Sequence, residues 1–364
     1  MTIPADPRLI ELLERATAEA LAGTARESDV FWSTVADAVS AVPVDEVLAS
    51  ALTFCRADAD PLRATGAGML AELCNLESEW RAEVLGVLLP LLERETSLDV
   101  TRIALHGVGL TRLADGISAL LLFATHADPG VRLDATHALY SCAGEPPSRA
   151  AIDRLIALSA DPDEHVRDWA TFGLGTEIDV DDADVRAALV DRLNDTFLDA
   201  REEAAVAVAR RGDVRAFDTV RELLEADEVS SLTVEAAGYL ADERLLRPLL
   251  ELGEWWEDDS ELLRAAIDRC DPVARTRFEA RLLALVERLE RDFDGRIPGA
   301  RLEDLTAERS SRELTSNLTA IWRDAAGLRR EATWPVERLF ARRDVEGDPE
   351  AAATIVLAEL AAPG

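Results

Sequence analysis

Basic charge is what this sequence has least of. It contains no lysine, and its 39 arginines are opposed by 71 acidic residues, which gives a formal net charge of −32. A field of that sign repels the phosphates of nucleic acids and anionic lipid surfaces. No stretch gathers enough arginine to form a local basic patch. We therefore expect neither a nucleic acid nor a membrane as partner.

Cysteine and long apolar runs are also scarce. The longest dense apolar run, Val84–Leu92, has nine residues, whereas a membrane-spanning helix needs about 20. The amino terminus lacks the basic and apolar segments of a signal peptide. The four cysteines show neither a CxxC motif nor metal-ligand spacing, so we expect buried thiols in a soluble, cytoplasmic protein: Cys55, Cys74, Cys142 and Cys270.

Motifs of catalysis are missing too. Serine and threonine occur without a nucleophile elbow, and the glycine-rich stretches do not have the setting of a phosphate loop. Carboxylates are so frequent that no pair stands out as acid and base. Histidine forms no HxxxH or HExxH motif, so we expect isolated side chains and no metal, cofactor or catalytic residue; the four are His106, His126, His137 and His165.

A repeated pattern is present instead. The stretch DPDEHVRDWATFGLG begins at Asp161, and related stretches recur when the chain is aligned on Arg167. Leucine-rich segments separate the copies, and both kinds of segment have helical periodicity. A period of this length indicates a helix-turn-helix repeat. The aligned positions, 39, 30, 35, 34, 32 and 31 residues apart, are Arg63, Arg102, Arg132, Arg167, Arg201, Thr233 and Arg264.

The pattern has a physical interpretation. We expect Asp161 to cap the second helix and Pro162 to occupy its first turn, where a missing N–H costs nothing. Small and apolar residues then form one stripe that lets neighbouring helices approach closely: Val166, Ala170, Gly173 and Leu174. Close packing is also the expected role of Gly107, Gly109 and Gly175.

These residues resemble the HEAT-like repeats, including the variety found in phycobilisome lyases, over about Val44 to Cys270. The resemblance implies an all-α fold, a right-handed α-solenoid of about seven helix-turn-helix repeats with helical caps at both ends. It also implies a ladder of hydrogen bonds between the turn aspartates and the second-helix arginines of adjacent repeats: Asp128, Asp161 and Asp195 with Arg132, Arg167 and Arg201.

The flanking segments lack the repeat pattern. We expect residues 1–42 to form a helical cap, residues 43–270 the solenoid, and residues 271–364 a helical cap or small domain. After Asp271, the sequence predicts one long helix, a loop and three further helical segments that end near Leu360.

A candidate binding surface follows from helix geometry. If the small-residue stripe is buried, the opposite face carries the positions one, five and eight after each arginine. In HEAT-like arrays the second helices line the concave face, so these residues would line a groove with an apolar centre and acidic edges: Ile103, Leu133, His137, Tyr140, Asp168, Phe172, Glu202 and Val206. Trp255 and Trp256 are secondary candidates, with packing under the carboxyl-terminal helices as the alternative.

Three kinds of function fit these features. The preferred hypothesis is a non-catalytic interaction scaffold or adaptor that binds a peptide or helix, basic and amphipathic, in the groove. An immunity protein or inhibitor that neutralises a basic toxin or nuclease is an alternative. A HEAT-like enzyme is another: nothing marks a bilin site, and the acidity disfavours a DNA glycosylase.

Overall fold

The structure, a computed structural model, describes residues 7–21, 25–76, 78–256, 260–297, 299–309 and 314–361. It divides into two compact units, Met1–Ala204 and Ala205–Gly364, which we call unit 1 and unit 2 and describe separately. Residues 1–6 and 22–24 of the expected amino-terminal cap lie outside the described residues. The borders expected near residues 42 and 270 stay predictions.

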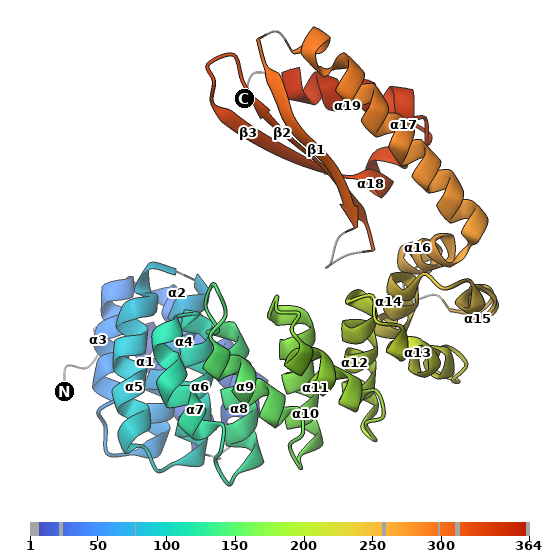
Figure 1. Cartoon of the computed structure of the whole chain (residues 1–364). Helices are drawn as coiled ribbons and strands as arrows, with labels where there is room; N and C mark the ends of the chain where they lie inside the picture. Colours follow the sequence, from blue (N-terminus) through green and yellow to red (C-terminus); the bar gives the residue numbers. More distant parts are fainter. Residues whose placement is uncertain are drawn as a thin grey trace. The chain divides into compact units, whose positions relative to one another are not determined.

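Unit 1 is built of paired helices (Figure 1). Its second helices pack on one another in succession, α4 on α6, α6 on α8 and α8 on α10. Its elements are α1 (Pro7–Ala20), η1 (Ala25–Glu27), α2 (Asp29–Ala41), α3 (Val44–Phe54), α4 (Asp60–Leu76), η2 (Ser78–Trp80), α5 (Arg81–Arg94), α6 (Leu98–Thr111), η3 (Ala114–Gly116), α7 (Ile117–Phe123), α8 (Pro129–Ser141), α9 (Arg149–Leu158), α10 (Glu164–Phe172), the π-helical turn η4 (Gly173–Glu177), α11 (Ala183–Arg192) and the start of α12 (Leu198–Arg210).

The pairs continue in unit 2. After the end of α12 come η5 (Val214–Ala216), α13 (Phe217–Leu224), α14 (Ser231–Leu240), η6 (Glu243–Leu245), α15 (Leu246–Leu252) and α16 (Ser260–Cys270). The described residues between Val44 and Cys270 thus hold seven helix pairs, α3/α4 to α15/α16. The helical solenoid and its number of repeats are confirmed.

The carboxyl-terminal part of unit 2 contains strands that the sequence analysis did not predict. The long helix α17 (Pro272–Arg296) is followed by β1 (Arg301–Arg309), β2 (Ser316–Arg323) and β3 (Arg329–Pro335), then by α18 (Val336–Phe340) and α19 (Pro349–Ala361). The strands form an antiparallel sheet in the order β1-β2-β3. The expectation of helical segments in this region is therefore wrong for residues 301–309, 316–323 and 329–335.

Local residues explain the sheet. Leu318 and Ala320 of β2 are buried while their neighbours are half-buried, which is the period of a strand with one covered face. The turn to β3 closes because Asp324 Oδ1 accepts hydrogen bonds from the N–H groups of Ala326 and Leu328, both at 2.9 Å. Gly327, at φ +80°, takes a conformation that favours glycine. Helices α17 and α19 contribute Leu285, Leu289, Phe293, Val356 and Leu357 to the core beneath this sheet.

The helix starts differ in one respect from the prediction. Asp128 caps α8 by accepting a hydrogen bond from Val131 N at 3.0 Å. In the next repeat Asp163, rather than Asp161, caps α10. Asp161 does not cap the helix. Its carboxylate instead accepts hydrogen bonds from Asp163 N and from Arg132.

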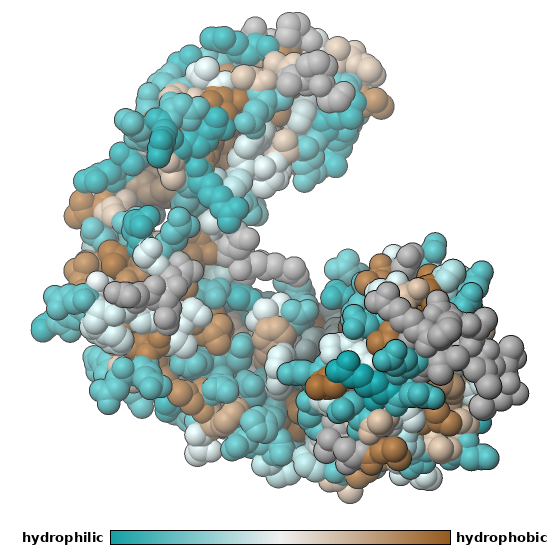
Figure 2. Space-filling view, turned by 180° about the vertical axis from the view of Figure 1, so that it is seen from behind, coloured by the Kyte–Doolittle hydropathy of each residue, from teal (hydrophilic) through white to brown (hydrophobic). Residues whose placement is uncertain are grey.

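The surface carries hydrophobic residues mostly as scattered single positions, as one face of the molecule shows (Figure 2). Such scatter is normal and marks no site. None of the described helices is long and apolar enough to cross a membrane.

All four cysteines are free and buried, as predicted. Burial raises the pKa of Cys55 and Cys270 to about 12 and the pKa of Cys74 and Cys142 to about 11. Because the thiolate is the reactive form, we expect no thiol to react with a disulfide reagent at pH 8 in the native protein within minutes. Four equivalents should react once guanidinium chloride unfolds the chain, and immediate labelling of the native protein would contradict this expectation.

Candidate functional site

Two of the expected ladder pairs are present. Arg132 donates from Nε and Nη2 to the two carboxylate oxygens of Asp161, at 2.8 and 2.7 Å. Arg167 binds Asp195 in the same bidentate way, at 2.9 and 2.8 Å. Their remaining Nη1 groups donate to backbone carbonyls of their own turns, His126 O and Asp161 O. These pairs fix the spacing of successive second helices on which the candidate surface lies.

Other ladder pairs differ from the expected set. Arg102 binds Asp134, inside α8, at 2.8 Å, while Asp128 serves as the helix cap. Arg63 binds Glu95 at 2.7 Å, so the carboxylate there is not an aspartate. The ladder pair assigned to Arg201 stays a prediction.

Four aromatic side chains on α8 and α10 form a contiguous group, which we call the aromatic cluster: His137, Tyr140, Trp169 and Phe172. The ring centroids lie 4.4 Å apart for His137 and Trp169 and 5.4 Å apart for Trp169 and Phe172. Tyr140 contacts Phe172 with centroids at 5.7 Å. Trp169 is 37% exposed, whereas the other three members of the cluster are half-buried.

A glycine makes the packing of the cluster possible. A Cβ atom on Gly173 would lie 2.7 Å from Cδ1 of Tyr140, closer than side chains approach. Gly173 also begins the π-helical turn η4, a local irregularity that is frequent at functional sites. The close-packing role predicted for Gly173 is confirmed, as it is for Gly107 and Gly109.

The amino-terminal segment covers the corresponding face of α6. Arg26 donates from its backbone N to Asp99 at 3.2 Å and lies with Nη2 3.4 Å from Nδ1 of His106. Trp32 packs edge-on against His106, with centroids 5.1 Å apart. Ile103 lies between Asp99 and His106 on this stripe and is fully buried. The amino-terminal segment therefore covers the part of the predicted groove that lies on α6.

The other predicted groove residues divide into two groups. Leu133, His137, Tyr140, Asp168 and Phe172 are half-buried, as surface residues of a packed face are. Glu202 and Val206 are buried, at 8% and 0% exposure, so their placement in the groove is wrong, like that of Ile103. Trp169 was missed because the chosen positions were one, five and eight after the arginine, and it lies two after Arg167. Its signal was its three-residue spacing from Phe172.

The ionisable side chains His137 and Asp168, in and next to the aromatic cluster, are neutral and negative at pH 7. Burial and the nearby Arg26 guanidinium lower the pKa of His137 to about 4, so its ring is neutral at pH 7. Nε2 of His137 is buried and has no hydrogen-bond partner among the described residues. Burial, followed by Asp199, raises the pKa of Asp168 to about 6, so this carboxyl group is mostly ionised at neutral pH.

The helix pairs, the ladder and the packed glycines agree with sequence matching. Residues 85–175 and 152–241 match the family model for HEAT repeats. These segments are HEAT-like repeats. The aromatic cluster lies within them, and the phycobilisome-lyase variety stays a prediction.

One protein appears in both the sequence and the structure comparisons. YibA of Escherichia coli K12 is 35% identical over 121 residues, which are 33% of this chain and 42% of YibA, and YibA of strain O157:H7 gives the same values. The chain spans less than half the length of this curated relative. An X-ray structure of E. coli YibA superposes with a TM-score of 0.54 at 22% identity, over 74% of this chain and 98% of that one, which shows a shared fold alone.

The other candidate contact residues, Trp255 and Trp256, are less suited to binding than the aromatic cluster. In unit 2, Trp255 is 54% exposed, whereas Trp256 is 7% exposed and donates from Nε1 to Val229 O at 2.9 Å. The burial of Trp256 corrects its placement as a contact residue. The described residues contain no group of three or more His, Cys, Asp or Glu side chains that could hold a metal ion.

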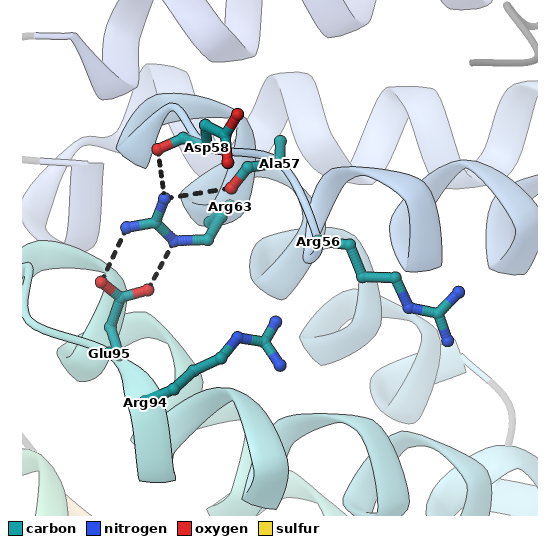
Figure 3. Close-up of a pocket in the computed structure, with 6 residues that line it drawn as sticks. All are labelled: Arg56, Ala57, Asp58, Arg63, Arg94 and Glu95. Atoms are coloured by element: carbon teal, nitrogen blue, oxygen red, sulfur yellow. Dashed lines mark hydrogen bonds and ion pairs between the residues drawn. The ribbon is translucent and has the colours of Figure 1, made fainter.

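A cavity of about 450 Å³ lies beside the Arg63–Glu95 pair, lined also by Arg56, Asp58 and Arg94 (Figure 3). Two of its arginines, Arg63 and Arg94, have structural partners. Arg63 donates to Glu95 and to Asp58 O, the latter at 2.7 Å, and Arg94 donates to Cys55 O at 2.7 Å. We interpret this cavity as a space around a ladder pair.

Proposed function

We propose that this chain is a non-catalytic interaction scaffold that binds a peptide or helix of a partner protein on the aromatic cluster. The observation that carries the proposal is that Trp169 is 37% exposed while its ring contacts those of His137 and Phe172. Tryptophan and tyrosine provide large contact areas at low entropic cost, and they are enriched where binding energy concentrates.

The repeat fold supports this proposal. A stack of helix pairs offers an extended, regular surface, and the ladder pairs hold neighbouring second helices at a fixed spacing. A surface that is already ordered loses little entropy when a partner binds.

Charge favours a basic, amphipathic partner. The chain carries a net charge of −32, and the arginines of α8 and α10 are held by Asp161 and Asp195. An approaching cationic segment therefore meets an acidic surface with apolar rings at its centre. The acidic charge speeds association and favours partners of positive charge.

Site-directed crosslinking tests the proposal. A benzophenone amino acid at position 169 should form a covalent adduct with one protein in the native cell, whereas the same group at Leu122 of α7, which is 74% exposed, should not. The captured protein is then purified and its Kd measured. We expect Trp169→Ala to weaken binding about tenfold or more and Leu122→Ala to leave the Kd unchanged. Equal binding by both variants, with circular dichroism showing intact helices, would overturn the proposal.

A further inference from the structure

Arginine, an aromatic ring and a carboxylate occur together three times among the residues that the structure describes. Arg244 lies 3.8 Å from the ring centroid of Phe217 and donates to Asp242 at 2.7 Å. Arg210 lies 5.5 Å from the ring of Tyr239 and 3.3 Å from Glu235. In the third case, Arg26 lies over Trp32 at 5.9 Å and binds Asp134 at 2.9 Å. We call this arrangement an arginine triad.

Helix α10 presents the ring and the carboxylate of such a triad without the guanidinium. Trp169 is exposed, and no cation lies over its ring among the described residues. The carboxylate of Asp168, its half-buried neighbour, accepts no hydrogen bond and forms no ion pair within the described part of the chain. Phe172 lies four residues after Asp168 and three residues after Trp169, so its side chain is a neighbour of each on the helix surface.

The arginines nearest in sequence are engaged elsewhere. Both carboxylate oxygens of Asp195 hold Arg167, at 2.8 and 2.9 Å, on the ladder. Arg132 is held in the same manner by Asp161. The described residues thus supply no guanidinium to Asp168 or Trp169, which leaves this place for a cation from outside the chain.

We propose that an arginine of the partner protein completes this fourth triad, with its guanidinium over the indole of Trp169 and hydrogen-bonded to the carboxylate of Asp168. This inference rests on the proposed function and names what that site recognises. Arginine suits it better than lysine because the planar guanidinium stacks on a ring while its N–H groups fit a carboxylate. The cluster beneath, His137, Tyr140 and Phe172, would contact apolar neighbours of that arginine.

A random dodecapeptide library displayed on phage tests the inference against the whole chain. The tightest peptide that depends on Trp169 is synthesised with arginine, lysine or neutral citrulline at its basic position, and each Kd is measured by fluorescence polarisation. We expect citrulline to weaken binding to the wild type about tenfold, and lysine less. Asp168→Asn should remove the difference between arginine and citrulline. Asp179→Asn, at an exposed aspartate nearby in sequence, is the matched control and should preserve the difference.

The outcomes separate the two proposals. Peptides that need Trp169 but bind equally with citrulline, or equally to Asp168→Asn, would overturn the arginine site and leave the scaffold intact. A library that yields no peptide dependent on Trp169 would count against both. Each variant is first compared with the wild type by thermal unfolding, so that loss of structure is not mistaken for loss of the site.

Discussion

Replacement of Asp134 by alanine is expected to lower the free energy of unfolding by about 3–5 kcal/mol. The Asp134 side chain is 1% exposed and binds two guanidinium groups, Arg26 at 2.9 Å and Arg102 at 2.8 Å. Removal of the carboxylate leaves both cations partly desolvated without their common counter-charge. It also releases the amino-terminal segment from α8, because Arg26 belongs to η1. Guanidinium chloride unfolding followed by circular dichroism measures the loss.

Asp128→Ala is the matched control for this prediction. Asp128 is the residue that the resemblance placed in the ladder, but it caps α8 through a single hydrogen bond to Val131 N at 3.0 Å. Loss of such a cap costs about 1 kcal/mol. If the two substitutions cost the same, the assignment of Asp134 as the carboxylate that joins the amino-terminal segment to the repeats is wrong.

Replacement of Asp195 by alanine is expected to cost about 2–3 kcal/mol at neutral pH and much less in acid. Asp195 accepts two hydrogen bonds from Arg167, and further ones from Arg192 and Phe197 N, both at 3.0 Å. The hydrogen bonds from Arg167 lower the pKa of Asp195 from 3.8 to about 2. A carboxyl group with a lowered native pKa stabilises the fold above its unfolded pKa, and this contribution disappears as the pH falls through the native pKa.

The measurement is the difference in unfolding free energy between wild type and Asp195→Ala at pH 7 and at pH 2.5. Because each pKa unit corresponds to about 1.4 kcal/mol, the difference should shrink by about 2 kcal/mol between the two pH values. Asp191→Ala, at an exposed aspartate one helical turn earlier, should show a small and pH-independent effect. A difference for Asp195→Ala that is constant with pH would contradict the role given to its ionised carboxylate.

The repeats could be predicted from the sequence because their residues act locally. Val166, Ala170 and Leu174 recur at helical spacing and are fully buried. Arg132 and Arg167 bind aspartates of the ladder that the resemblance to HEAT-like repeats implied. The pairing of Arg102 with Asp134 could not be predicted in this way. It depends on Arg26, a residue outside the repeats that shares the same carboxylate.

The β-sheet and the complete aromatic cluster could not be predicted from the sequence, for a similar reason. Strand β1, RLEDLTAER, consists largely of residues that also suit helices, and its pairing with β2 supplies what local preference does not. Trp169 lies outside the face expected from ideal helix positions, yet its ring turns toward His137 of the preceding repeat, at 4.4 Å. Contacts between segments, not residue preferences within one segment, decided both outcomes.

The ladder pairs also affect how unit 1 unfolds. Arg132 and Arg167 each bind a carboxylate of the following repeat, Asp161 and Asp195 respectively. Cooperativity therefore passes along one dimension, from neighbour to neighbour, without a central core shared by all repeats. Severing one interior pair divides the array into two shorter cooperative blocks, each of which unfolds according to the strength of its own remaining interfaces.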